Sequence, residues 1–350
     1  MSDTDWLFNP VAAPDEAARA RAIERQNQLT KPPGSLGRLE TIATDFAAWQ
    51  GNDRPALDRI DLAVFAADHG VAARGVSAFP QAVTAQMIGN FARGGAAVAV
   101  LAREHGADMA VINLGTATPI EAGLGVIDRQ LAPGTADFTQ RAAMDTATLG
   151  AALAIGAEHV RVDQSLFVGG EMGIANTTSA AAVFAAMADL DGRASVGRGT
   201  GVDDAGMAAK REAVDAGLAR HRARWHDEST PRATLAMLET LGGLEIAALV
   251  GAYVAAAQRG VPILVDGFIS SVAALAATRI NAGVAGWLLF GHRSAEAGHT
   301  RALDALGARP LLDLDMRLGE ASGAMTAIGV IRSALAVHAE MATFAEAGIA

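Results

Sequence analysis

Short, uninterrupted apolar runs recur along the middle of the chain, and each is followed by glycine or a polar turn and then by a longer helical pattern. The runs that we interpret as strands are 61–67, 109–113, 165–168, 262–265, 287–290 and 310–312. Helical patterns between or after them include 82–104, 178–188, 269–279 and 295–305. Strands that are apolar throughout and alternate with helices indicate a parallel sheet covered on both faces. The pattern therefore predicts an α/β fold.

Helical patterns also dominate both ends of the chain. One spans 15–28, a second begins at Leu36 or Gly37 and ends at Trp49, and a third runs from Ser322 to about residue 345. The Pro-Pro-Gly sequence between the first two must interrupt any helix. We expect a small helical domain built from residues 1–55 together with 320–350. Residues 56–319 would then form a large α/β domain that binds a nucleotide and carries the catalytic site.

Composition narrows the class of protein. The chain has 350 residues, 51% of them hydrophobic, which is enough to bury a sizeable core. Its net charge of -10, without a basic run, argues against nucleic acid or an anionic membrane as a partner. The absence of cysteine excludes disulfides, thiolate metal sites and cysteine nucleophiles. No secretory signal and no apolar stretch of about 20 residues are present, so we expect a cytoplasmic protein.

Two segments that follow predicted strands have the chemistry of a phosphate site. Gly169 and Gly170 precede Thr177 and Thr178 at a helix start, where free amides can bind an anion. The alternative is a glycine turn in which Thr177 or Thr178 caps the helix. A second glycine loop at 197–201 is followed by Lys210, one of only two lysines in the chain. A retained lysine suggests a site that requires a compact ammonium group.

Other strand ends offer weaker candidates. His69 follows Asp68 and could be a base or a metal ligand, but a histidine satisfied by local hydrogen bonds is the simpler interpretation, and no ligand cluster points to a metal. Ser77 and Phe79 could line a pocket for an aromatic ligand. Glu320 lies among small residues at a helix start, where it could be a base of raised pKa or an ordinary capping residue.

Five segments in the same order resemble the nicotinate-nucleotide:dimethylbenzimidazole phosphoribosyltransferase family over nearly the full length. They are LTKPPGSLGRLE at 29–40, ADHGVAARGVSAFPQAVTAQMIGNFARGG at 67–95, GGEMGIANTTS at 169–179, GHRSAEAGH at 291–299 and RLGEASGA at 317–324. The stretch 117–158 offers nothing to match. The resemblance implies a Rossmann-like large domain, a helical domain made from both chain ends, and a homodimer. It also implies transfer of phosphoribose from nicotinate mononucleotide to 5,6-dimethylbenzimidazole with inversion, without a cofactor or metal.

The resemblance also implies roles for individual residues. The catalytic carboxylate would be Glu320, with Glu171 as the second carboxylate of the site. The residues implied to contact the nucleotide are Gly170, Met172, Gly173, Asn176, Thr177, Thr178, Gly199, Thr200, Gly201, Lys210 and Ser294. The base pocket would draw on Ser77, Leu318 and Gln86.

Two alternatives remain open at this point. The chain could be another phosphoribosyl or glycosyl transferase that uses the same phosphate cradle with a different base. It could also be a noncatalytic nucleotide-binding module that binds nicotinate mononucleotide and leaves it intact.

Overall fold

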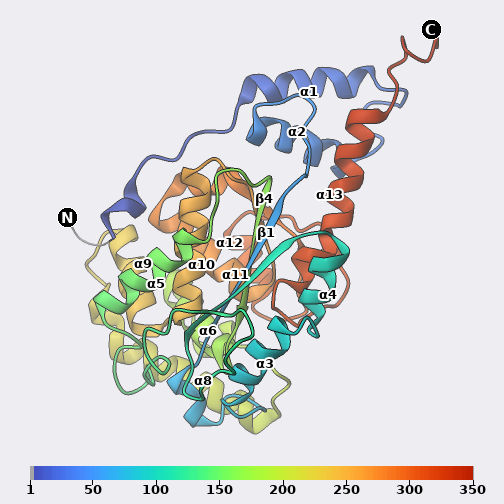
Figure 1. The fold of residues 1–350 in the computed structure, drawn as a ribbon. Coiled ribbons are helices and arrows are strands. Elements are labelled where there is room, and N and C mark those ends of the chain that lie inside the picture. The colour runs from blue at the N-terminus through green and yellow to red at the C-terminus, as the bar shows by residue number, and fades with distance from the viewer. Residues whose placement is uncertain (1–3, 350) are drawn as a thin grey trace.

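A parallel sheet lies at the centre of the structure, a computed structural model that describes residues 4–349 (Figure 1). Its strands are β1 (Ile60–Ala67), β2 (Asp108–Gly115), β3 (Ile127–Asp128), β4 (Leu166–Met172), β5 (Ile263–Val265) and β6 (Leu288–Phe290). They follow the order β3-β2-β1-β4-β5-β6, and each neighbouring pair is parallel. This order reverses direction between β1 and β4, as in doubly wound nucleotide-binding folds. The α/β fold predicted from the hydrophobic pattern is therefore confirmed.

Helices cover both faces of the sheet. On one face, α10 (Leu244–Gln258) and α11 (Phe268–Ile280) contact the central strands, and α5 (Thr146–Glu158) packs behind α10. On the other face, α3 (Val83–Ala92), α4 (Ala97–Glu104) and α13 (Ser322–Glu340) pack against the strands (Figure 1). All eight residues of β1 are buried, because neither face of the strand meets water.

The remaining elements connect these layers. The helices are α6 (Asn176–Ala188), α7 (Gly192–Ser195), α8 (Asp204–His221), α9 (Thr230–Leu241) and α12 (His299–Ala305). The 3-10 turns are η1 (Asp5–Phe8), η2 (Gly70–Arg74), η3 (Arg222–Arg224) and η4 (Ala282–Trp287). A second, two-stranded parallel sheet pairs β7 (His292–Arg293) with β8 (Leu312–Asp313). None of the helices within residues 4–349 is long and apolar enough to cross a membrane.

Three details differ from the pattern-based prediction. The single helix expected at 82–104 is two helices, because the chain turns at Gly94, whose φ is +76°. The last expected strand, 310–312, does not join the main sheet but contributes to β8. The unassigned stretch 117–158 contains β3 and α5; β3 has only two residues, both exposed, so its apolar pattern was too short to detect.

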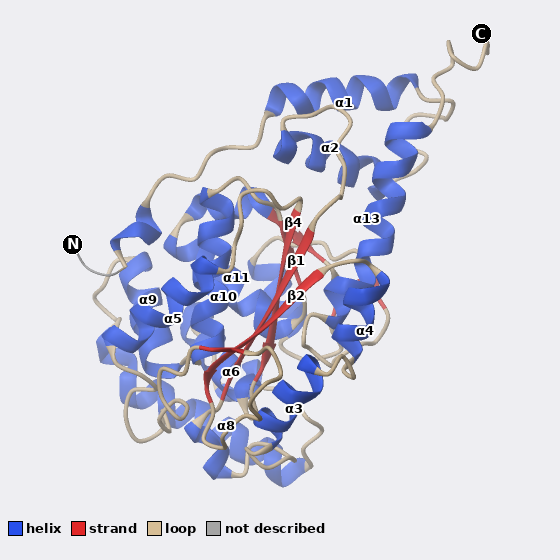
Figure 2. Cartoon of the chain, in the orientation of Figure 1, coloured by secondary structure: helices blue, strands red, loops and turns tan. Residues whose placement is uncertain are grey.

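Helices from the amino-terminal and carboxyl-terminal parts of the chain pack together in one group (Figure 2). Helix α1 (Glu16–Gln28) packs on α2 (Arg38–Gln50), which packs on α13. The Gln26 amide nitrogen lies 2.7 Å from Nδ1 of the buried His338, and Arg25 Nε donates to the carbonyl of His338 at 2.8 Å. We propose on these contacts that α1, α2 and α13 form the core of the helical domain expected from residues 1–55 and 320–350. The segment before α1 lies instead against the large domain, where the main-chain carbonyls of Trp6, Leu7 and Ala12 accept from Gln258, Asn281 and Trp287. Residues 1–3 and 350 lie outside the described part.

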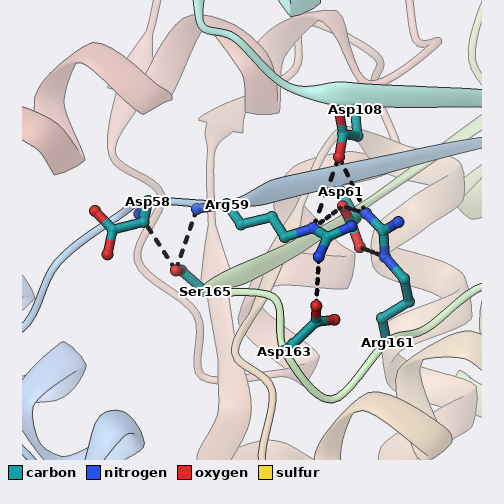
Figure 3. A network of polar contacts seen from close by, with 7 residues as sticks. All are labelled: Asp58, Arg59, Asp61, Asp108, Arg161, Asp163 and Ser165. Carbon is teal, nitrogen blue, oxygen red and sulfur yellow. Dashed lines mark hydrogen bonds and ion pairs between the residues drawn. The ribbon is translucent and has the colours of Figure 1, made fainter.

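The amino ends of the central strands are tied together by charged side chains (Figure 3). Arg161 bridges Asp61 of β1 and Asp108 of β2, with 2.7 Å from Nε to Asp61 Oδ2 and 3.2 Å from Nη2 to Asp108 Oδ2. Arg59 makes ion pairs with the same two aspartates and with Asp163. This network lies at the edge of the sheet opposite to the carboxyl ends of the strands, so it serves the fold and leaves the other edge free for a ligand.

Helices α5 and α10 approach each other so closely that only glycine fits at their contact. A Cβ added to Gly251 would lie 2.0 Å from the carbonyl oxygen of Leu153, and one added to Gly156 would lie 1.8 Å from that of Ala248. Both obstacles are backbone atoms, so the clash cannot be relieved by a side-chain rotation. The packing of α5 behind the sheet therefore depends on these two glycines.

We expect Gly251→Ala to lower the free energy of unfolding by about 1–3 kcal/mol, because the added methyl group forces the two helices apart. The measurement is the urea midpoint followed by circular dichroism. Gly329→Ala is the matched control: Gly329 is an exposed position inside α13, and its added Cβ would have nothing within 4 Å. The control should leave the midpoint unchanged or raise it, since alanine favours helix. Equal midpoints for Gly251→Ala and wild type would contradict this packing argument.

Candidate active site

A pocket of about 500 Å³ opens at the carboxyl edge of the sheet, next to the point where the strand order reverses. Ten of the residues expected in the site line it: Glu171, Met172, Gly173, Asn176, Thr177, Gly199, Thr200, Ser294, Leu318 and Glu320. The sequence segments that supply them lie far apart in the chain and are brought together by the parallel sheet. The position agrees with the rule that doubly wound folds bind ligands at this edge.

Glu171 is the penultimate residue of β4 and lies on the pocket floor. Its side chain is buried, and both carboxylate oxygens accept hydrogen bonds. Asn176 Nδ2 donates to Oε2, and the main-chain N–H of Glu320 lies 3.4 Å from Oε1. Burial raises the pKa of Glu171 well above its usual range, and the nearby carboxylates of Glu245 and Asp266 raise it further. Glu171 therefore binds a proton more tightly than an exposed glutamate does.

Glu320 lies beside it, two residues before α13 begins. Only 6% of its surface is exposed, and its Oε2 has no hydrogen-bond partner among the described residues. Burial raises the pKa of Glu320 to about 7, with a further contribution from the charge of Asp266. A carboxylate whose pKa lies near the working pH is suited to accept a proton from a ligand. Glu320 is one of the residues that line the pocket.

The predicted phosphate cradle is assembled from three elements. Lys210 reaches from α8 and donates from Nζ to Thr177 Oγ1, in the first turn of α6, at 2.9 Å. The glycine loop closes over this pair at Gly199, whose φ is +50° and whose added Cβ would lie 2.8 Å from Lys210 Nζ. Burial lowers the pKa of Lys210 to about 8, although the charge of Glu296 acts in the opposite direction. A bound phosphate would supply the negative charge that this buried ammonium lacks.

The start of α6 differs from the capping alternative. The helix begins at Asn176, and its N-cap is Ala175 with a φ of +77°, so the interpretation of Thr177 or Thr178 as the cap is wrong. Within the described chain, no side chain caps this helix. The main-chain N–H groups of Asn176 and Thr178 already donate to the carbonyls of Gly173 and Ala175, so the first turn leaves the N–H of Thr177 for an anion in the pocket.

Six expected site residues do not line the pocket: Ser77, Gln86, Gly170, Thr178, Gly201 and Lys210. Gln86 is exposed on α3, because the inward face of that helix is occupied by Thr84, whose Oγ1 accepts from the main-chain N–H of Ile174 at 3.1 Å. Ser77 instead hydrogen-bonds to Thr200 Oγ1 at 3.2 Å and so supports the glycine loop. Lys210 lies behind Thr177, as described above.

Three of these six lie just outside the pocket. Gly170 lies directly beneath the turn at Glu320, because a Cβ there would come within 2.6 Å of the carbonyl oxygen of Glu320. Thr178 is fully buried in α6, immediately behind the phosphate cradle. Gly201, with a φ of +96°, lies in the turn that ends the glycine loop.

The mouth of the pocket carries large apolar side chains. Phe79 and Leu318 are 52% and 57% exposed, and both line the cavity together with Phe268. Exposed apolar side chains around a polar floor suit a flat aromatic ligand. Phe79 was anticipated beside Ser77, and Leu318 from the family resemblance.

His69 is buried and fully occupied by internal contacts. One ring nitrogen lies 2.9 Å from Ser179 Oγ, and the other lies 2.7 Å from Glu245 Oε1. The structure thus supports the histidine satisfied by hydrogen bonds over the base or metal ligand. Within residues 4–349, no cluster of three or more His, Asp or Glu side chains is placed to hold a metal ion.

Sequence reasoning missed two acidic residues of the site. Asp266 directly follows β5 and precedes Gly267 at the start of α11, so its place at a strand end was a usable signal. Glu296 lies in the GHRSAEAGH segment and accepts from the main-chain N–H of Gly199 at 3.2 Å. Its contact with a loop almost a hundred residues away had no signal in the pattern.

Known proteins resemble this chain over almost its whole length. A family model described as "Phosphoribosyltransferase" matches residues 11–349. The nicotinate-nucleotide–dimethylbenzimidazole phosphoribosyltransferase of Xanthomonas oryzae pv. oryzae is 56% identical over 349 residues, which cover 99% of this chain and 98% of that protein. The Pseudomonas aeruginosa protein of the same name is 53% identical over 348 residues, which cover 98% of this chain and 97% of that protein.

A solved structure shares both the fold and the sequence. The crystal structure of the protein of this name from Thermus thermophilus superposes with a TM-score of 0.88 at 41% identity, covering 96% of this chain and 99% of that one. The family model and the two relatives extend this agreement to the full chain, as the five quoted segments predict. The chain belongs to the nicotinate-nucleotide–dimethylbenzimidazole phosphoribosyltransferase family.

Proposed function

We propose that the protein transfers phosphoribose from nicotinate mononucleotide to 5,6-dimethylbenzimidazole, with inversion at the anomeric carbon. The products are α-ribazole 5'-phosphate, the nucleotide of the cobalamin lower ligand, and nicotinate. The observation that carries the proposal is the unpartnered carboxylate oxygen of Glu320, buried at the pocket with a pKa near 7, in a chain of this family. We further propose that the protein is a cytoplasmic homodimer, as the resemblance implies.

The reaction needs one base and no general acid. In nicotinate mononucleotide the pyridine nitrogen carries a positive charge, so cleavage of its bond to the anomeric carbon returns the electron pair to the ring and releases neutral-ring nicotinate. One benzimidazole nitrogen attacks the anomeric carbon from the opposite face. Glu320 accepts the proton from the other ring nitrogen. A single displacement in a fixed orientation converts the β-nucleotide into an α-nucleotide.

Different parts of the pocket suit different parts of the substrates. We place the phosphate at the cradle of Lys210, Thr177 and the start of α6, where the buried ammonium supplies positive charge. The aromatic acceptor fits the apolar mouth at Phe79 and Leu318. Glu171 and Glu320 line the same pocket, so we place the reacting ribose carbon beside these carboxylates. In this arrangement Glu171 serves the phosphoribose side of the site.

The test of the reaction is incubation with nicotinate mononucleotide and a panel of benzimidazole, purine and phenolic acceptors. We expect a product with the mass of α-ribazole 5'-phosphate and the α configuration at its anomeric carbon, established by mass spectrometry and NMR. A product with another base but none with dimethylbenzimidazole would indicate a different transferase. Binding of the nucleotide without consumption of it, whatever acceptor is supplied, would indicate a noncatalytic module.

We expect Glu320→Gln to lower kcat by about 10²–10⁴-fold, because glutamine keeps the shape of the side chain but cannot accept the azole proton. Binding of nicotinate mononucleotide, measured by calorimetry, should change little. Glu171→Gln is the comparison: it should weaken nucleotide binding at least as much as it lowers turnover. Near-normal kcat in Glu320→Gln at saturating dimethylbenzimidazole would remove Glu320 from the mechanism.

The pH dependence follows from the pKa of Glu320. The base must be ionised, so kcat should be constant well above pH 7 and fall as the pH drops through about 7, by about tenfold for each further unit. Initial rates at saturating substrates over pH 5.5–8.5 measure this acid limb, the part of the profile in which kcat falls as the pH is lowered. A profile that stays flat down to about pH 5, as for an unperturbed carboxylate, would contradict the assigned environment of Glu320.

We expect Lys210→Ala to raise KM for nicotinate mononucleotide by about 10–100-fold, which corresponds to about 1.4–2.7 kcal/mol for a charge-assisted contact. Lys210→Arg should not restore it, because Gly199 leaves no space for a wider head group. The matched control is the other lysine, Lys31, which pairs with Glu40 at 2.8 Å in the terminal helices. Lys31→Ala should lower stability and leave this KM unchanged. Equal KM values for wild type and Lys210→Ala would contradict the assignment of Lys210 to the phosphate cradle.

A further inference from the structure

Asp266 is a buried acidic residue whose place in the site is unexplained by substrate contact. It follows β5 at the carboxyl edge of the sheet, and only 1% of its surface is exposed. It is not among the residues that line the pocket. A carboxylate taken out of water at such a position is costly unless its oxygens are used by the surrounding structure.

Both of its oxygens are used by the backbone around Glu320. The main-chain N–H of Ala321 donates to Asp266 Oδ2 at 3.2 Å, and that of Ala324 donates to Oδ1 at 2.8 Å. The N-cap position of α13 is Ala321, which has no side-chain oxygen to cap the helix. Asp266 therefore supplies, from a strand 55 residues earlier in the chain, the cap that the local sequence lacks.

The backbone that it holds is in an unfavourable conformation. Glu320 and Ala321 have φ angles of +66° and +77°, and Gly319 before them has +84°. Non-glycine residues adopt this left-handed conformation at a cost, and they keep it only where the surroundings enforce it. Without its acceptor at Asp266, the turn can relax toward ordinary angles. Such a relaxation would move the Glu320 carboxylate out of its place at the pocket.

The same carboxylate also acts on Glu320 through its charge. The ionisable side chains that line the pocket with Glu320 are Glu171 on β4, Glu296 before α12 and Arg317 in the segment before the turn. Outside the lining, Asp266 after β5 and His292 on β7 lie close to each other. Of these groups, Asp266 is the one whose charge adds to burial in raising the pKa of Glu320. His292 Nε2 lies 3.6 Å from Asp266 Oδ1, a distance at which the two form an ion pair when the imidazole is protonated.

We propose that Asp266 is a positioning residue for Glu320: it holds the left-handed turn through two main-chain hydrogen bonds and places a buried negative charge beside the base. This inference rests on the function proposed above. The two acidic residues then have different roles. Glu320 accepts the proton, and Asp266 determines the position of the Glu320 carboxylate and how strongly that carboxylate binds the proton.

The test is the pH profile of kcat in Asp266→Asn, which keeps one acceptor oxygen and removes the charge. We expect kcat on the plateau to fall at least tenfold and the acid limb to move to lower pH by about one unit, because Glu320 loses a neighbouring negative charge. Asp266→Glu restores the charge without the geometry, so its limb should stay near that of wild type while its plateau remains low. A limb that does not move in Asp266→Asn would overturn the inference.

Two further variants separate this role from a loss of stability. Asp61→Asn removes a buried carboxylate at the opposite edge of the sheet (Figure 3), so it should lower the unfolding midpoint and leave the limb in place. If Asp266→Asn does not fold, the limb is measured in Asp266→Asn combined with Ala321→Gly, because glycine adopts the left-handed angle without support. An unmoved limb there counts equally against the inference.

A failure of the proposed function can be distinguished from a failure of the inference about Asp266. In that case wild type itself would form no α-ribazole 5'-phosphate, and no limb could be measured in any variant. If wild type is active but Glu320→Gln keeps the same acid limb, the limb belongs to another group, and the role of Asp266 in tuning Glu320 is overturned while the reaction stands.

Discussion

Three acidic side chains are buried close together where the strands of the sheet end. The rest of the site depends on how the structure offsets the loss of their hydration. Glu171, Asp266 and Glu320 are each at most 6% exposed. Amide donors satisfy the first two, namely Asn176 and the backbone at 320, 321 and 324. Glu320 keeps one oxygen without a partner in the described chain. Because burial removes much of their hydration, Glu171 and Glu320 hold a proton more tightly than an exposed carboxylate does.

The fold makes this arrangement possible by allowing backbones to approach one another. Gly170 lets β4 pass beneath the carbonyl of Glu320, and Gly319 lies so close to Glu171 that an added Cβ would be 2.6 Å from Oε1. Gly199 brings its loop down onto Lys210 in the same way. The many glycines around the pocket are therefore requirements of close contact, rather than signs of flexibility.

Much of the fold and about half of the site could be predicted from the sequence. The buried strands were recognisable because they are apolar throughout, and the polar residues that follow them, such as Thr177, were anticipated because parallel strands end at one edge. The role of Glu171 was implied by the family resemblance alone. Asp266 was missed although it obeys the same rule. Gln86 was misplaced because a helix turns about 100° per residue, so Thr84 rather than Gln86 faces the site. The contact of Glu296 with Gly199 is made only by tertiary folding.

Helix α13 connects the turn at Glu320 to the terminal helices, and this has a consequence for how the protein folds. Helices α1 and α2, on which α13 is supported, precede the whole central sheet in the chain, whereas the turn at Glu320 follows it. The last helix can therefore dock on the first ones only after the sheet between them has been synthesised. Closing so long a loop is a late, entropically demanding event. We therefore expect the turn at Glu320 to be among the last parts of the pocket to become ordered as the chain folds.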